Sequence, residues 1–104
     1  MNLVLVYITC PSQDLALSIT KELLARRLIA CANFMPVTTI CRWEGAVEES
    51  KEVILLCKTR AELCDKITSE VEKLHPYKIP AILTIPISAN HAFAQWVKDE
   101  TTQS

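Results

Sequence analysis

A histidine sits between a helix-forming segment and two prolines in the stretch "LHPYKIP", residues 74–80. Imidazole is a common ligand of copper and zinc and can change its charge near neutral pH, so His75 is a candidate metal ligand. The alternative is structural. An imidazole at the end of a helix can hydrogen-bond the last carbonyl groups, and Pro76 cannot continue a helix. The residues alone leave both interpretations open.

Cysteine is the usual second ligand of a soft metal such as Cu(I), and Cys10 falls at the end of the first expected strand, where ligands often collect. An ordinary packing role for this thiol is the alternative. The chain holds five cysteines with no Cys-x-x-Cys spacing, which argues against a disulfide framework or a zinc ribbon. We expect the other four to pack as small residues in a reducing compartment, with no assigned chemistry: Cys31, Cys41, Cys57 and Cys64.

Length, composition and charge limit the classes of function. At 104 residues, half of them hydrophobic, the chain is expected to form one packed domain, 1–104. A formal net charge of -1 without a basic cluster predicts no nucleic-acid partner. The N-terminal apolar run is too short to span a membrane and lacks a basic leader, so we expect a cytoplasmic protein. With one glycine and no recognisable nucleophile turn, the sequence predicts no catalysis.

Helical periodicity marks the segments that position these residues. Apolar residues recur at helical spacing in 13–28 after Ser12, and again in 60–74 after Thr59, and both preceding residues are typical helix caps. Asn90 is expected to open a short final helix that carries Trp96. Each longer helix therefore has one apolar side to lay on a sheet.

Strand-like segments fill the intervals between these helices. They are residues 2–9, an extended region at 29–43 that Pro36 interrupts, residues 47–58, and residues 81–87. Glu44 and Gly45 are typical of a turn. Pro86 is compatible only with a sheet edge or a bulge. The order predicts an α+β fold, a ferredoxin-like βαββαβ sandwich with an antiparallel sheet and an extra C-terminal helix. Its hairpin is expected to be longer than one small domain can cover.

Several motifs together resemble the CutA family of divalent-cation tolerance proteins. In chain order they are "LIACANF", "RWEG", "EVILLCKTR" and "HPYKIPAI". The resemblance implies a homotrimer similar in shape to PII signalling proteins, associated with tolerance to copper and other divalent cations. It also implicates the "HPY" histidine, here His75, in copper binding. The family cysteine near the first strand aligns with Ile8, so Cys10 is a displaced ligand on the same face of the sheet.

The same resemblance implies a ligand cleft between subunits. Its candidate lining residues are Trp43, Glu44, Tyr77, Lys78 and Trp96, although both tryptophans suit simple interface packing as well. Lys78 replaces a residue that is often acidic in the family, which favours an anionic ligand over a carboxylate metal site. The leading hypothesis is a non-catalytic homotrimer that binds copper or another divalent metal. The alternative is a PII-like sensor that binds a small anionic metabolite in the cleft.

Overall fold

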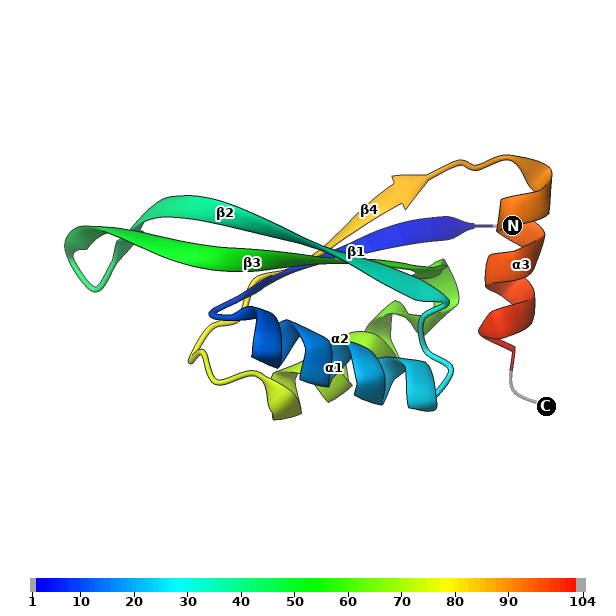
Figure 1. Ribbon diagram of the computed structural model, residues 1–104, viewed down its shortest axis with the longest axis horizontal. Coiled ribbons are helices and arrows are strands. Elements are labelled where there is room, and N and C mark those ends of the chain that lie inside the picture. Colours follow the sequence, from blue (N-terminus) through cyan, green and yellow to red (C-terminus); the bar gives the residue numbers. More distant parts are fainter. Residues whose placement is uncertain (1, 103–104) are drawn as a thin grey trace.

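Four strands and three helices make up the computed structural model, which describes residues 2–102 (Figure 1). The first and last two residues of the expected domain, 1–104, lie outside this range. In chain order the elements are β1 (Leu3–Cys10), α1 (Gln13–Ala25), β2 (Cys31–Trp43), β3 (Ala46–Arg60), a 3-10 turn (Ala61–Leu63), α2 (Cys64–Leu74), β4 (Ile82–Ile87) and α3 (His91–Glu100).

The four strands form one antiparallel sheet in the order β2-β3-β1-β4. In its register Ile8 of β1 lies opposite Leu55 of β3 on one side and Ile82 of β4 on the other. This confirms the predicted ferredoxin-like fold with an added C-terminal helix. The two longest strands pair over their whole length, from Cys31 opposite Lys58 to Trp43 opposite Ala46.

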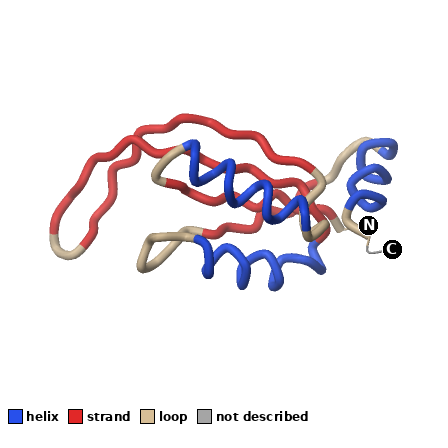
Figure 2. Tube along the Cα trace, turned by 60° about the horizontal axis from the view of Figure 1, so that its bottom comes forward, coloured by secondary structure: helices blue, strands red, loops and turns tan. Residues whose placement is uncertain are grey.

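The core lies between the sheet and the two longer helices, which run side by side on one face of it (Figures 1 and 2). Strand alternation sends every second residue of β1 towards them, so Val4, Val6, Ile8 and Cys10 are buried with Ile19 and Ile67 of the helices. Burial of this apolar surface supplies the main driving force for folding. Among the described helices, none is long and apolar enough to cross a membrane.

On the opposite face of the sheet, α3 packs against Leu3 and Ile87 at one end, and within residues 2–102 no other helix lies over this face (Figure 1). Strand pairing places Leu83 beside Tyr7, and Tyr7 beside Leu56, on this side. Leu83 is 52 % exposed and Ile85 is 42 % exposed. We call this surface, formed by Leu5, Tyr7, Leu56, Leu83 and Ile85, the open face.

Beyond the end of β1, the β2–β3 hairpin continues as a two-stranded arm, drawn at the left of Figures 1 and 2. Strand β1 ends at Cys10, opposite Val53, and the hairpin runs on from there to its turn. Glu44 (φ 48°) and Gly45 (φ 84°) make that turn, as predicted, because a tight hairpin of matching twist needs positive φ at both positions. The arm explains the molecule's longest dimension of 45 Å.

Three local predictions were wrong, each for a tertiary reason. Pro36 does not interrupt β2, since this outer strand has a neighbour on one side only and tolerates a proline. Thr59 is no helix cap: it lies in β3, where its buried hydroxyl donates to the carbonyl of Leu28 at 2.6 Å. Helix α1 ends at Ala25 rather than at residue 28, because Arg27 adopts φ 58° and reverses the chain.

Helix α3 is fastened at its carboxyl end by two arginines. Arg27 donates to the carbonyl oxygens of Asp99 and Thr102 at 3.2 and 3.1 Å. Arg60 donates to the carbonyl oxygen and to the hydroxyl of Thr101 at 2.8 and 2.9 Å. The unsatisfied carbonyls of a helix end are its negative pole, so cationic donors suit this position.

Candidate functional site

His75 is the residue that ends α2, and its ring is held from both sides. Its backbone N–H donates to the carbonyl oxygen of Val71, while Nε2 lies 2.8 Å from the carbonyl oxygen of Thr9 in β1. The backbone N–H of Tyr77 donates to Nδ1 at 3.2 Å. The residue as a whole is 7 % exposed. The predicted capping role is therefore played by the backbone, and the imidazole links α2 to the end of β1 instead.

These partners assign the tautomer of His75. A carbonyl oxygen only accepts and a backbone N–H only donates, so Nε2 carries the proton and Nδ1 presents its lone pair. The imidazole is neutral in this arrangement. Neutral imidazole is also the form that binds metals, but the lone pair it would use is directed at the amide of Tyr77.

A carboxylate from β3 contacts the loop that follows α2. Glu52 is 8 % exposed, and its Oε2 accepts a hydrogen bond from the hydroxyl of Tyr77. Burial, followed by this bond to Glu52, raises the pKa of Tyr77 well above its ordinary value, so the hydroxyl keeps its proton and donates. The Tyr77 ring also lies against His75, with centroids 4.7 Å apart.

Cys10 lies one residue beyond Thr9 but has its side chain in the core, where it is fully buried. Burial and the Glu52 carboxylate raise the pKa of the Cys10 thiol from 9.0 to about 11. A thiolate, not a thiol, is the form that binds metals. As packed, Cys10 therefore resembles the structural cysteine that was its alternative interpretation.

A preformed metal centre does not fit these residues. Within residues 2–102, no three side chains of histidine, cysteine, aspartate or glutamate are grouped so that they could hold a metal ion. His75 and Cys10 approach the same end of β1, yet one has both ring nitrogens engaged and the other is protonated. These two residues could therefore coordinate a cation only after local movement.

The remaining cysteines form no disulfide within residues 2–102, and their assignment to packing stays a prediction. All five are free thiols. Burial raises the pKa of Cys57 to about 12 and also raises that of Cys64. Cys41, on the arm, is exposed. No disulfide joins any two of the five cysteines.

The candidate cleft residues are not gathered within one chain. Trp43 and Glu44 lie at the tip of the arm, whereas Trp96 lies on α3 at the opposite end of the molecule (Figure 1). Tyr77 and Lys78 lie in the loop between α2 and β4. A single cleft could contain all five only if different subunits contributed them.

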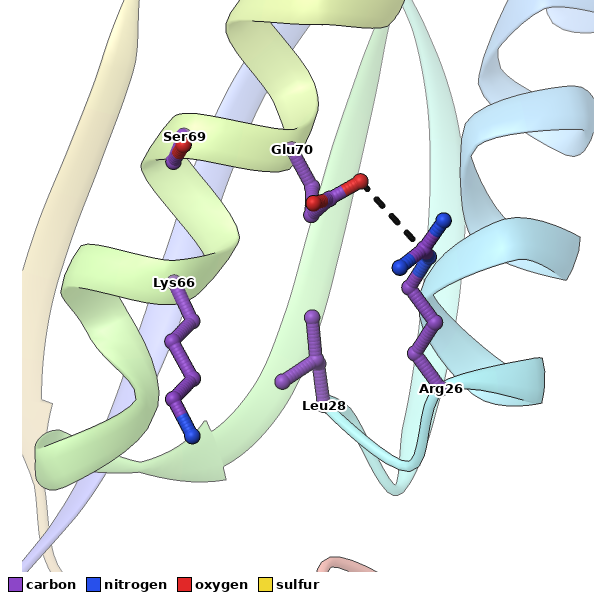
Figure 3. A pocket seen from close by; sticks show the side chains of 5 residues that line it. All are labelled: Arg26, Leu28, Lys66, Ser69 and Glu70. Carbon is purple, nitrogen blue, oxygen red and sulfur yellow. Dashed lines mark ion pairs between the residues drawn. The ribbon is translucent and has the colours of Figure 1, made fainter.

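A hollow between the carboxyl end of α1 and the first two turns of α2 contains none of the predicted site residues (Figure 3). Its lining is Arg26, Leu28, Lys66, Ser69 and Glu70. Arg26 Nε lies 2.7 Å from a carboxylate oxygen of Glu22 and 3.6 Å from one of Glu70. Arg26 is therefore engaged by carboxylates, and Lys66 is the second cation of the lining.

Sequence reasoning missed Glu52. It lies 25 positions before Tyr77, and only the register of β3 brings the two together. The one available signal was an acidic residue directly preceding the apolar run "VILLC", where a strand enters the core. A carboxylate at such a boundary has to find a donor when it is buried.

Comparison with known proteins gives a consistent family. A family model described as CutA1 divalent ion tolerance protein matches residues 4–100. The divalent-cation tolerance protein CutA of Thermus thermophilus is 41 % identical over 98 residues, covering 92 % of this chain and 95 % of that one. Protein CutA of Homo sapiens is 34 % identical over 97 residues, which cover 91 % of this chain and 54 % of the human one.

Solved structures agree with the sequence relatives. The divalent ion tolerance protein CutA1 of Ehrlichia chaffeensis superimposes with a TM-score of 0.91 at 38 % identity, covering 98 % of this chain and 97 % of that one. The periplasmic divalent cation tolerance protein CutA of Archaeoglobus fulgidus gives 0.94 at 35 % identity, covering 96 % and 99 %. The likeness extends over essentially the whole of each chain.

Proposed function

Because the chain belongs to the CutA1 divalent ion tolerance family, we propose that it serves divalent-cation tolerance by binding copper, or another divalent cation, through His75. The observation that supports this role is the neutral imidazole of His75, whose Nδ1 lone pair meets a single backbone donor at 3.2 Å. Displacing one such donor is a small local change, and imidazole nitrogen suits copper well.

Cys10 is the second ligand in this proposal, and it joins only when its thiol leaves the core and loses its proton. Since that costs free energy, binding through His75 and Cys10 is weak and pH-dependent. Weak binding suits a protein that buffers or senses a cation better than one that keeps a resident metal. The raised thiol pKa is also the opposite of what a nucleophile needs, which supports a non-catalytic role.

Assembly as a homotrimer is part of the same proposal, and the open face supports it. Its apolar side chains come from β1, β3 and β4: Leu83 and Ile85 are exposed, and Leu5, Tyr7 and Leu56 are partly exposed. Large exposed apolar surfaces on a sheet mark protein contacts, and copies of one chain close them with rotational symmetry. We propose that second and third copies cover it.

A cytoplasmic location is proposed on the cysteines. All five are free, including the exposed Cys41, which suits a compartment that keeps thiols reduced. The relative from Archaeoglobus fulgidus is described as periplasmic, so location within the family is not uniform. Cell fractionation with antibodies against the chain, beside cytoplasmic and periplasmic marker proteins, would contradict this placement if the chain followed the periplasmic marker.

A calorimetric titration with Cu(II) tests the metal proposal. The wild-type protein is compared with His75→Ala and with His91→Ala, a matched control that removes the exposed histidine at the start of α3. We expect saturable binding that His75→Ala abolishes and His91→Ala retains, while light scattering gives an unchanged trimer mass. Binding that is absent, or equal in all three proteins, would contradict the proposal.

A sensor of small anions is the second candidate. It is favoured by the separation of Trp43 and Trp96 at opposite ends of one chain, because a pocket that used both would form only between subunits (Figure 1). The exposed ammonium group of Lys78 would supply the charge for an anion. Thermal stabilisation by citrate or pyrophosphate that Lys78→Gln removes would support this function. No stabilisation by either anion would contradict it.

A further inference from the structure

Tyr77 makes two hydrogen bonds that point in different directions. Its backbone N–H donates to Nδ1 of His75, and its hydroxyl donates to Oε2 of Glu52 on β3. Because the amide and the hydroxyl belong to one residue, the hydrogen bond of the hydroxyl to Glu52 also restricts the position of the amide. Glu52 therefore influences the hydrogen bond at Nδ1 of His75 through Tyr77, without contacting the imidazole itself.

The side-chain bond is the stronger of the two. Glu52 is 8 % exposed, and a buried charge needs a donor. Hydrogen bonds to charged groups contribute about twice as much as those between neutral groups. The amide-to-imidazole bond joins neutral partners at 3.2 Å. The position of residue 77 is thus set mainly by Glu52, and the amide follows.

We propose that the Tyr77–Glu52 hydrogen bond is a latch that controls the access of a divalent cation to His75. The inference rests on the proposed function, because it takes His75 as the ligand. While the latch is closed, the Tyr77 amide occupies the Nδ1 lone pair, and a cation has to compete with it. Opening the latch frees that nitrogen. Tyr77 and Glu52 are positioning residues here, and neither one binds the cation.

The opening is local because both ends of the loop are held elsewhere. Thr9 accepts from Nε2 of His75 at one end, and its own N–H donates to the carbonyl oxygen of Ala81 at the other. Pro76 and Pro80 stiffen the segment between them. Residue 77 can therefore move away from Glu52 while the helix end and the start of β4 remain in place.

The metal-free protein gives the first test. Amide hydrogen exchange at position 77 is measured by NMR in wild type, Tyr77→Phe and Glu52→Gln, with the exposed Glu48→Gln and Glu49→Gln on β3 as controls. We expect about tenfold faster exchange in Tyr77→Phe, a smaller increase in Glu52→Gln, which retains a neutral acceptor, and no change in the controls. Unchanged exchange in Tyr77→Phe would overturn the latch.

Copper binding gives the second test, on variants that keep the wild-type mass and circular dichroism. We expect Tyr77→Phe to bind Cu(II) about tenfold more tightly than wild type, since the amide that competes for Nδ1 is no longer held in place by the bond to Glu52. A purely structural role for Tyr77 would weaken binding instead. Equal or weaker binding in Tyr77→Phe would overturn the latch as a control of access.

The double variant separates the two proposals. Adding His75→Ala to Tyr77→Phe is expected to remove both the basal binding and the gain. If Cu(II) binding requires His75 but its affinity is unchanged by Tyr77→Phe, the latch is contradicted and the proposed function is retained. If Cu(II) binding ignores His75 in every variant, the proposed function fails, and with it the role of the latch in metal access.

Discussion

The carbonyl oxygen of Thr9 accepts a hydrogen bond from Nε2 of His75 at 2.8 Å, across 66 positions of the chain. The same residue donates its N–H to Ala81 at 3.4 Å, so the end of β1 holds both ends of the loop that follows α2. The histidine is therefore part of the fold whether or not it binds a cation. Its removal has a structural consequence that can be measured without metal.

His75→Ala is expected to lower the free energy of unfolding by about 1–3 kcal/mol, because the Thr9 carbonyl loses its partner near the core. Urea unfolding at a fixed chain concentration measures this, since assembly shifts apparent stability. His91→Ala is the matched control and should change stability by less than about 0.5 kcal/mol, because that side chain is exposed. Equal stability of His75→Ala and wild type would contradict the linkage.

The buried thiols are expected to resist alkylation in the native protein. With its pKa raised to about 11, Cys10 is about one-thousandth thiolate at pH 8, and the exposed Cys41 should react with iodoacetamide long before it. Mass spectrometry of digests after brief labelling measures the order, with urea-unfolded protein as the control in which all five react. Early labelling of Cys10 in the folded protein would show that its thiol leaves the core readily.

The same shift predicts a loss of stability at high pH. The folded state keeps the Cys10 proton to about pH 11, whereas the unfolded thiol loses it near pH 9.0. Unfolding therefore releases a proton in this range, so the free energy of unfolding falls as pH rises from about 9 towards 11. Urea unfolding of Cys10→Ala over the same range should show a shallower decline than wild type. Parallel declines would contradict the contribution from Cys10.

A charge on the open face is expected to break the assembly. Leu83→Lys places an ammonium group among apolar side chains that we propose other copies cover, and light scattering should then give the mass of one chain. Leu24→Lys is the matched control, since Leu24 is similarly exposed but lies on α1, on the helical side. Loss of assembly in the control, or its retention in Leu83→Lys, would place the interface elsewhere.

Arg60→Met is expected to loosen the carboxyl end of α3 because it removes both donors to Thr101 while keeping the apolar stem. We expect faster amide exchange in residues 91–100 and a loss of about 1–3 kcal/mol in unfolding free energy. Exchange in β1 and β3 should change little, and the exposed Arg42→Met on the arm serves as the control. Unaltered exchange in α3 would show that Arg27 alone suffices.

Local signals in the sequence predicted the fold well where the local chemistry decides the structure. Ser12 caps α1 by accepting from the amide of Leu15 at 3.2 Å, and Gly45 turns the hairpin. The local predictions were wrong where contacts between distant segments of the chain determine the structure. Thr59 looks like a helix cap, yet its hydroxyl belongs to the Leu28 carbonyl, which the chain brings near only after folding. Propensity cannot report such a partner.

The candidate site was predictable in part, for a similar reason. His75 was found because its residue type and its neighbouring prolines are visible in one short segment. Its two ring partners and the carboxylate beneath Tyr77 come from β1, the loop and β3, which no spacing within that segment encodes. Whether Trp43 and Trp96 share a cleft is a question about several copies of the chain and stays a prediction.

Both outer strands contain a proline: Pro36 lies in β2 and Pro86 in β4. Proline has no N–H, so each edge lacks a donor that an incoming strand would need to continue the ladder. Growth of the sheet into amyloid-like fibres is therefore impeded at both margins, even though "VILLC" has the strand-forming composition of an aggregating segment. The chain can bring apolar faces together at high concentration with a lower risk of open-ended polymerisation.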